Sequence, residues 1–296
     1  MESTETEAGA AAVIRPLGLD DLPGALRLSA SANWNQNKAD WRNMLALGQG
    51  WGLHATDEAG AEQLAASTVV LPYGNRFAWV SMVLVLPAFQ RRGYASRMLR
   101  HALGWLSARG LGAVLDATPA GHAVYVQEGF ADTWGFARYR REAGAARSAP
   151  HPGLASRALR EADWPAIAAL DEPAFGADRL PLLRSLARRW PEAARVIEVG
   201  GQLRGFVLGR DGREARQIGP LLAREPDVAR SLIADALGAT DGAVYLDLLD
   251  SHADLLPWLR QQGFALQRPF TRMVSGIGAA PGDADAVVLA AGPELG

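Results

Sequence analysis

The sequence has no cysteine, a single lysine (Lys38) and no large excess of either charge. Without cysteine the chain can form no disulfide, thiolate metal site or cysteine nucleophile. Nearly every cation is therefore an arginine, whose permanent charge suits ion pairs and phosphate binding alike. The formal net charge of −2 argues against a general nucleic-acid-binding protein, because such proteins usually present a strongly basic face. The five histidines show no metal-ligand spacing, so we expect no metal site.

Long apolar runs are also missing. No run reaches the roughly 18 residues that a membrane-spanning helix needs. The first residues, MESTETEAGAAA, lack the basic and apolar parts of a signal peptide. These absences lead us to expect a cytoplasmic protein that binds neither membrane nor nucleic acid, as a monomer or a homodimer.

The length of 296 residues and the 49% hydrophobic content suit two domains of about 140 residues each. An internal repeat supports this division. Ile14–Leu28 aligns without gaps to Ser156–Leu170, and Glu128–Arg138 aligns to Gln262–Arg272. Each copy begins with an expected strand, followed by a helix start in which Asp21 or Asp163 precedes a proline.

The amino-acid composition indicates where each of the two domains begins and ends. Residues 143–155 are rich in Ala, Gly, Pro and Ser and predict a linker. The first domain is therefore expected over residues 12–142 and the second over 156–277. After Met273 the chain turns to Gly, Ala and Pro, which predicts a loosely held tail over 278–296.

The most specific pattern lies between an expected strand and an expected helix. Trp79–Leu86 is β-branched and apolar up to Pro87, whereas Ser96–Leu106 repeats its apolar residues at helical spacing. The turn between them, residues 90–95 (QRRGYA), is basic and contains Gly93. Backbone N–H groups and the helix dipole converge at such a turn and form an anion site. Its natural ligand is a pyrophosphate.

The segment VLVLPAFQRRGYASRML, residues 83–99, resembles the acetyl-coenzyme A (acetyl-CoA) motif of the GCN5-related N-acetyltransferases (GNAT), V-x-P-x-[FY]-[RQ]-x-x-G-x-[GA]. The matching residues are Val85, Pro87, Phe89, Gln90, Gly93 and Ala95. The resemblance covers residues 12–142 and, more weakly, 156–277. It implies a mixed α/β fold of two tandem domains, each with a central, mostly antiparallel twisted sheet flanked by helices.

The resemblance also implies where acetyl-CoA binds. The main chain of Val83 and Val85 would pair with the pantetheine arm, with Val83 nearest the thioester. The pyrophosphate site would be formed by the turn and the helix start: Gln90, Arg91, Arg92, Gly93, Tyr94, Ala95 and Ser96. Thr118 stands where the family usually has Asn. It can cap the following helix, but it reaches less far toward the cofactor.

Two residues are implied as catalytic. Tyr125 precedes Gly129 by four residues, as in the family's Y-x-x-x-G-F, and would protonate the departing thiolate of coenzyme A. The alternative is a tyrosine that only packs its helix against the sheet. The strand before the turn has no carboxylate, so the nearest base is Asp116 or a water molecule. Alternatively, Asp116 is a structural carboxylate.

Recognition of the amine acceptor is implied for the first helices, where Trp34, Asn35 and Asn37 lie. The alternative is a helix start in which Asn37 or Asp40 caps and Trp41 lies in the core. In the second copy, Arg224–Asp227 replace the pyrophosphate turn and Leu259 replaces the tyrosine. This copy should not bind acetyl-CoA, and we expect it either to help wall the acceptor pocket, with residues 175–179 and Asp247, or to be purely structural.

The sequence thus predicts an N-acetyltransferase whose first domain transfers an acetyl group from acetyl-CoA directly to a small-molecule or peptide amine. Two alternatives remain. One is a non-catalytic, regulatory acyl-CoA-binding protein, which the missing strand carboxylate favours. The other is a protein or N-terminal-amine acetyltransferase, because nothing in the sequence fixes the size of the acceptor.

Overall fold

The computed structural model describes residues 12–145 and 154–296. The predicted linker over 143–155 therefore lies largely outside the described residues. The first half contains β1 (Val13–Pro16), α1 (Leu22–Ser31), α2 (Lys38–Leu47), β2 (Gln49–Thr56), β3 (Glu62–Tyr73), β4 (Phe77–Val85), α3 (Tyr94–Ser107), β5 (Gly112–Ala117), α4 (Pro119–Gln127) and β6 (Ala131–Arg141).

The second half repeats this order, which fits the internal repeat in the sequence. It contains β7 (Arg157–Ala158), α5 (Trp164–Phe175), α6 (Leu180–Arg189), β8 (Arg195–Val199), β9 (Gln202–Arg210), β10 (Arg216–Ala223), α7 (Pro226–Leu237), β11 (Val244–Leu249), α8 (Leu256–Gln261) and β12 (Ala265–Ser275). One further strand, β13 (Val287–Leu289), follows. The expected mixed α/β fold, with a mostly antiparallel sheet flanked by helices, is confirmed.

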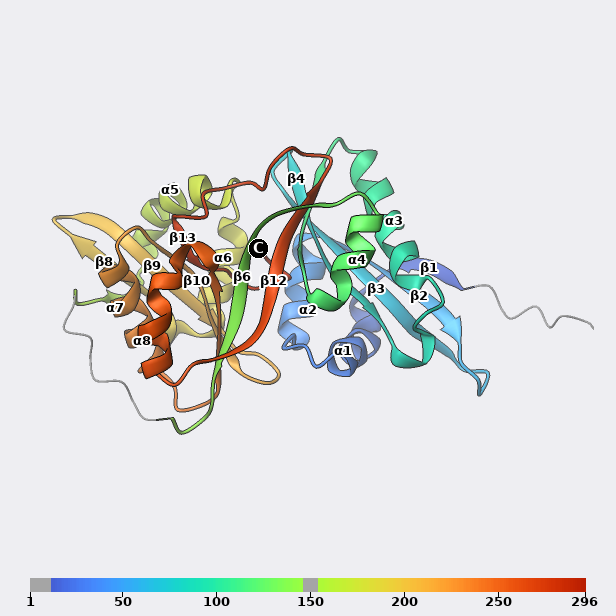
Figure 1. Cartoon of the computed structure of the whole chain (residues 1–296), viewed down its shortest axis with the longest axis horizontal. Helices are drawn as coiled ribbons and strands as arrows, with labels where there is room; N and C mark the ends of the chain where they lie inside the picture. Colours follow the sequence, from blue (N-terminus) through green and yellow to red (C-terminus); the bar gives the residue numbers. More distant parts are fainter. Residues whose placement is uncertain (1–11, 146–153) are drawn as a thin grey trace, which may run out of the picture.

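The two copies share one continuous sheet of 13 strands because they exchange their last strands. The order is β1-β2-β3-β4-β5-β12-β6-β11-β13-β10-β9-β8-β7. β12 of the second copy pairs with β5, and β6 of the first copy pairs with β11. Between them, Phe136 of β6 stacks on Phe270 of β12 with 4.9 Å between ring centroids. Figure 1 shows β6 and β12 side by side at the centre of the molecule.

Local chemistry explains where the helices near the site begin. The side chain of Asn37 accepts hydrogen bonds from the N–H groups of Ala39 and Asp40, which caps α2. Thr118 caps α4 in the same way through the N–H of Gly121. Helix α3 buries Met98, Leu99, Ala102 and Leu106 against the sheet, the face that their spacing predicts.

The prediction of a loosely held tail over 278–296 is wrong. Residues 286–296, which we call the closing segment, are almost wholly buried between the two halves, and Figure 1 shows the end of the chain at the centre of the molecule. The indole of Trp79 donates to the carbonyl of Pro293, and the hydroxyl of Tyr73 donates to that of Leu295. A segment rich in Gly, Ala and Pro is typical of a loosely held tail. Its small side chains, however, also allow it to pack closely in the narrow space between the two halves.

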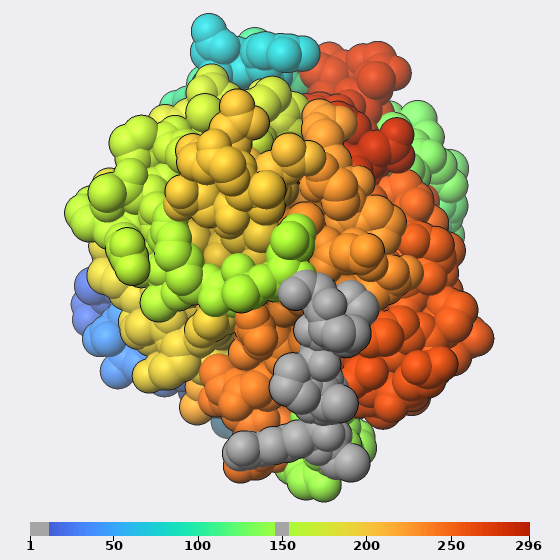
Figure 2. Space-filling model, turned by 90° about the vertical axis from the view of Figure 1, so that its left-hand side faces the viewer, coloured from blue at the N-terminus to red at the C-terminus, as the bar shows by residue number. Residues whose placement is uncertain are grey.

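The second half presents its own broad outer surface, which the yellow-to-orange part of the chain forms in Figure 2. Within residues 12–145 and 154–296, no helix combines the length and the apolar character that crossing a membrane requires. The same ranges contain no group of three or more His, Asp or Glu side chains suited to holding a metal ion.

Candidate active site

The site begins where two neighbouring strands separate. β4 and β5 pair in parallel only from Phe77–Gly112 to Trp79–Val114. Beyond that point β4 is kinked: its register with β3 shifts and Met82 adopts a φ of +51°. A register shift of this kind bends a strand away from its neighbour. The edge of β4 from Ser81 to Val85 is therefore left without pairing to β5.

The gap continues into a groove that ends on the basic turn. Gly93 caps α3 with a φ of +74°, and Arg91 has a φ of +61°. These left-handed conformations turn the backbone at the start of α3, whose first residues line the groove and whose first N–H groups have no partner within the helix. The groove is lined by most of the predicted cofactor residues: Val83, Val85, Gln90, Arg91, Gly93, Tyr94, Ala95, Ser96 and Thr118.

Arg92 is the predicted cofactor residue that does not line the groove. Its guanidinium donates to the carbonyl of Ala88 and lies 5.3 Å from the centroid of the Phe89 ring. It therefore stabilises the turn instead of lining the groove.

Tyr125 and Asp116 both lie at the inner end of this groove. The ring of Tyr125 packs edge-on against Phe130, at 6.0 Å between centroids. Its hydroxyl makes no hydrogen bond with the described residues. Burial raises the pKa of Tyr125 to about 12, so the phenol keeps its proton at neutral pH. A protonated hydroxyl that faces the groove can act as an acid.

Asp116 is held by the other half of the molecule. Both of its carboxylate oxygens accept from Arg272 of β12, at 2.8 and 3.0 Å, and Arg272 itself lies between the rings of Trp79 and Trp134. Burial raises the pKa of Asp116 to about 6, although Arg272 opposes the shift. This geometry resembles that of a structural carboxylate more than that of a free base.

A second cavity opens from the inner end of the groove. Trp34, Val83, Asp116, Thr118 and Tyr125 line both spaces, so the two communicate at the predicted thioester position. The second cavity, which we call the acceptor cavity, is further lined by Gln36, Val80, Ser81, Met82, Leu115, Arg138, Arg268, Phe270, Pro293 and Glu294.

The expected acceptor residues separate into two groups. Trp34 does line the acceptor cavity. Asn35 does not: its amide donates to the carbonyl of Ala215 and accepts from two N–H groups of the loop before β10. Asn37 caps α2 and donates to Asp211. The two amides hold the halves together, because both contact the loop between β9 and β10 of the second half. Neither Asn35 nor Asn37 lines the acceptor cavity.

The second half does wall the acceptor cavity, but with other residues than expected. Its contribution comes from Arg268 and Phe270 of β12 and from Pro293 and Glu294 of the closing segment. Asp247 is instead paired with Arg138 at 2.7 Å. Phe175 packs on Tyr73, and Arg179 donates to the carbonyl of Gly296. A short motif in the sequence signals none of these, because the strand exchange and the buried closing segment bring them to the site.

The corresponding gap in the second half is filled. β10 and β11 also pair in parallel for three residues, from Arg216–Val244 to Ile218–Leu246. Beyond these, β13 lies between them and pairs with both. At the start of α7, Glu225 occupies the cap position and forms an ion pair with Arg204, and Asp227 lies in the first turn. Carboxylates at this position repel a pyrophosphate.

Family comparisons match both halves. Residues 30–130 match the acetyltransferase (GNAT) family, and residues 167–287 match an acetyltransferase (GNAT) domain. A relative in Bacillus subtilis (strain 168), the uncharacterized N-acetyltransferase YitH, is 24% identical over 249 residues, which are 83% of this chain and 85% of the relative.

Solved structures share the fold over nine tenths of the chain or more. A putative acetyltransferase from Pyrococcus horikoshii has a TM-score of 0.76 at 22% identity, covering 100% of this chain and 99% of that one. A GCN5-related N-acetyltransferase from Sphaerobacter thermophilus has a TM-score of 0.66 at 15% identity, with 93% and 98% covered. A tandem GNAT protein from the clavulanic acid biosynthesis pathway has 0.64 at 14%, with 91% and 100% covered.

Proposed function

We propose that this chain, which belongs to the GCN5-related N-acetyltransferase superfamily as a tandem member, transfers an acetyl group from acetyl-CoA to an amine at the site in its first half. One observation carries the proposal. The groove between β4 and β5 joins the basic turn to the acceptor cavity, and Tyr125 stands where the two meet. The equivalent gap of the second half holds β13 instead.

The groove has the parts that an acyl thioester needs. The N–H groups at the start of α3, with the helix dipole, suit the pyrophosphate. The unpaired edge of β4 offers backbone groups to the pantetheine arm. An N–H near Val83 that is aimed at the thioester carbonyl would stabilise the developing oxyanion, and such a donor typically contributes about 3–4 kcal/mol.

The reaction we propose is a direct transfer within a ternary complex. The neutral nitrogen of the amine attacks the thioester carbonyl carbon, a C–N bond forms and the C–S bond breaks. The thiolate takes the proton of the Tyr125 hydroxyl, and the surplus proton on the nitrogen passes to a base and so restores the phenol. Holding both substrates at the junction supplies much of the rate.

The base is Asp116 or a water molecule. Asp116 lies at the junction, and a pKa of about 6 suits a base near neutral pH. However, both of its oxygens accept from Arg272, which favours water.

Cofactor binding is tested with a matched pair of glycine substitutions. Gly93 and Gly74 both have positive φ and open space at the Cβ position, but Gly74 lies in the turn before β4, at the other end of that strand. We expect Gly93→Asp to weaken acetyl-CoA binding at least 100-fold in calorimetry, because a carboxylate then faces the pyrophosphate. Gly74→Asp carries the same strain and charge and should bind normally.

Equal affinity of wild type and Gly93→Asp would show that the cofactor lies elsewhere. Catalysis is tested separately, by coenzyme A release with a panel of amines. Tight binding of acetyl-CoA without release by any amine would support the non-catalytic, acyl-CoA-binding alternative.

A further inference from the structure

The acceptor cavity contains buried polar atoms that nothing in the described chain satisfies. The hydroxyl of Ser81, the side-chain oxygen of Gln36 and Oε2 of Glu294 all lack a hydrogen-bond partner, and all three residues line this cavity. Buried polar groups without partners are rare in folded proteins and cost about 1–3 kcal/mol each. Their presence around one cavity indicates that a bound ligand supplies the missing hydrogen bonds.

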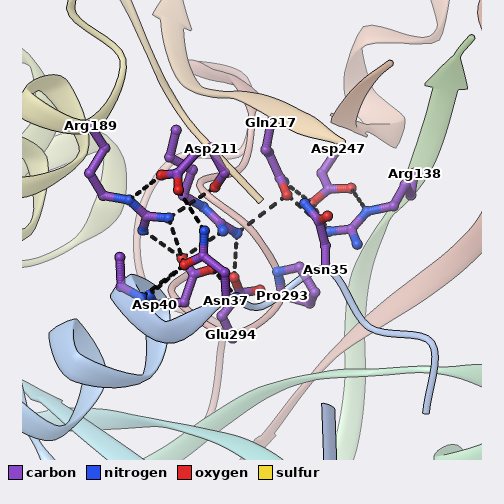
Figure 3. Close-up of polar contacts among 12 residues, drawn as sticks. Asn35, Asn37, Asp40, Arg138, Arg189, Asp211, Gln217, Asp247, Pro293 and Glu294 are labelled. Atoms are coloured by element: carbon purple, nitrogen blue, oxygen red, sulfur yellow. Dashed lines mark hydrogen bonds and ion pairs between the residues drawn. The ribbon is translucent and has the colours of Figure 1, made fainter. Parts of the chain in front are cut away.

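Glu294 contributes a negative charge to the lining of the acceptor cavity. Its Oε1 accepts from Arg210, whose guanidinium also donates to Asp40. Figure 3 shows Glu294 and Asp40 within one cluster of polar side chains. Glu294 and Asp40 are both fully buried, and Asp40 also accepts from Arg189 at 2.6 Å. Arg210 therefore fixes the orientation of Glu294, while Oε2 stays available for a cation.

Arg268 contributes a positive charge to the lining of the same cavity. The other arginine that lines it, Arg138, is neutralised by a bidentate ion pair with Asp247. Arg268, by contrast, makes no hydrogen bond or ion pair with residues 12–145 and 154–296. Burial and the neighbouring Arg138 lower the pKa of Arg268, so its charged form lacks a compensating anion.

We propose that the acceptor is a free amino acid, whose ammonium group binds Glu294, Ser81 and Gln36 and whose carboxylate binds Arg268. The ammonium gives one proton to water before its neutral nitrogen attacks the thioester carbonyl. The three uncharged or anionic oxygens match the three N–H donors of an ammonium, and a guanidinium suits a carboxylate. This inference rests on the proposed acetyl transfer and names its substrate class.

The remaining lining of the cavity selects the side chain. Trp34, Met82, Leu115 and Phe270 offer apolar surface, which suits an apolar amino acid. A peptide with a free N-terminus is excluded from the full set of contacts, because its first carbonyl carbon belongs to an amide and leaves Arg268 without an anion. Arg268 thus distinguishes a free amino acid from the end of a protein chain.

The test uses matched acceptors with the full chain. Alanine, leucine, methionine and phenylalanine are each compared with their carboxamides and with the corresponding decarboxylated amines. We expect kcat/KM for at least one of these amino acids to exceed that of its amide and its amine at least 100-fold. Arg268→Gln should abolish this preference, whereas Arg109→Gln, at the end of α3 and outside both cavities, should retain it.

A second variant tests the cation side. Glu294→Gln keeps the volume and the oxygen that Arg210 binds, but removes the charge, so we expect KM for the amino acid to rise at least tenfold while KM for acetyl-CoA stays unchanged. Glu62→Gln, in an exposed ion pair with Arg15, is its control. If Glu294→Gln unfolds, the comparison of Arg268→Gln with wild type still decides the proposal.

Equal use of amino acid, amide and amine by the wild type would overturn the proposal, as would a preference that Arg268→Gln leaves intact. Binding is also measured by calorimetry with the protein saturated with coenzyme A. If no amine releases coenzyme A, the proposed function fails. Tighter binding of an amino acid than of its amide would then still support the proposed amino-acid site. Equal binding of the two, or binding of neither, would contradict it.

Discussion

At the scale of the residue, burial determines the protonation of Tyr125 and Asp116, which lie where the groove meets the acceptor cavity. It raises the pKa of both Tyr125 and Asp116. For the tyrosine this preserves the proton that an acid must give. For the aspartate it brings the pKa close to neutral pH, but the Arg272 guanidinium occupies both oxygens. Burial alone thus suits the tyrosine to act as an acid, whereas the ion pair with Arg272 holds the aspartate in place.

Replacing Tyr125 with Phe should lower kcat about 100-fold, the usual size of a lost general acid. KM for acetyl-CoA should change little, because the ring and its packing on Phe130 remain. Tyr94→Phe, which also removes a hydroxyl from the groove, is the control and should keep kcat within about twofold. Steady-state release of coenzyme A measures both, and an unchanged kcat in Tyr125→Phe would contradict the role of acid.

Replacing Asp116 with Asn tests the base and the pH dependence of stability together. With water as the base, kcat should stay within about tenfold of wild type across pH 5–9. A loss of 100-fold or more, together with the disappearance of a rising limb near pH 6, would assign the base to Asp116.

The stability of the same variant follows from linkage. The folded pKa of Asp116 is raised from 3.8 to about 6, so the folded state binds this proton more tightly than the unfolded state does. The stabilisation that comes from the protonated group is present below about pH 4 and is lost as the pH rises through 6. We expect wild type to lose stability relative to Asp116→Asn as the pH rises over this range, measured by urea unfolding. A constant difference would contradict the shift.

At the scale of the element, the closing segment contacts both halves of the molecule. Its strand β13 fills the gap between β10 and β11, and its following residues wall the acceptor cavity. One short segment therefore fills the gap between β10 and β11 in the second half and lines the acceptor cavity beside the first half.

Removing residues 293–296 should separate acceptor use from cofactor binding. The deletion abolishes the hydrogen bonds that Trp79, Tyr73 and Arg179 donate to this segment, and the ion pair of Arg210 with Glu294. We expect a loss of about 5 kcal/mol and a Tm lower by about 10 °C or more in calorimetry.

Acetyl-CoA should still bind to this deletion variant, because the groove lies wholly within the first half. Acetylation of the acceptor should fall below detection, since Glu294 and Pro293 are gone. Glu294→Gln retains the backbone hydrogen bonds and should lose much less stability. Full activity of the deletion variant would show that the closing segment takes no part in the acceptor site.

At the scale of the whole molecule, the exchanged strands make the two halves depend on each other. β5 finds its partner in β12, and β6 finds one of its partners in β11. Expressed alone, residues 1–145 would leave these strand edges and the apolar face around Phe136 exposed. The sequence boundaries at 142 and 156 separate the repeats along the chain, whereas the sheet assembles across them.

We expect residues 1–145 and 154–296 to aggregate when each is produced alone, and to form a soluble 1:1 complex that binds acetyl-CoA when produced together. Size-exclusion chromatography with circular dichroism measures both states. A monomeric first half with native affinity for acetyl-CoA would show that it closes its own sheet, and would contradict the structural need for the exchange.

The parts that the sequence alone predicts are those built by neighbouring residues. Gly93 in the basic turn, the caps at Asn37 and Thr118, and the apolar face of α3 each depend on a few adjacent positions. Local backbone sterics, capping and periodicity fix such features. The internal repeat added the order of the elements, and both family matches agree with it.

Sequence by itself thus determined the family, the two copies and the basic turn at Gly93, because these follow from short-range chemistry that each copy carries within itself. Only the tertiary structure decided that β12 crosses to β5, that residues 286–296 are buried, and that Arg268 and Glu294 face one cavity. Strand pairing and burial join residues far apart in the chain, and many arrangements satisfy the same local pattern. The packing of the whole molecule selects among them.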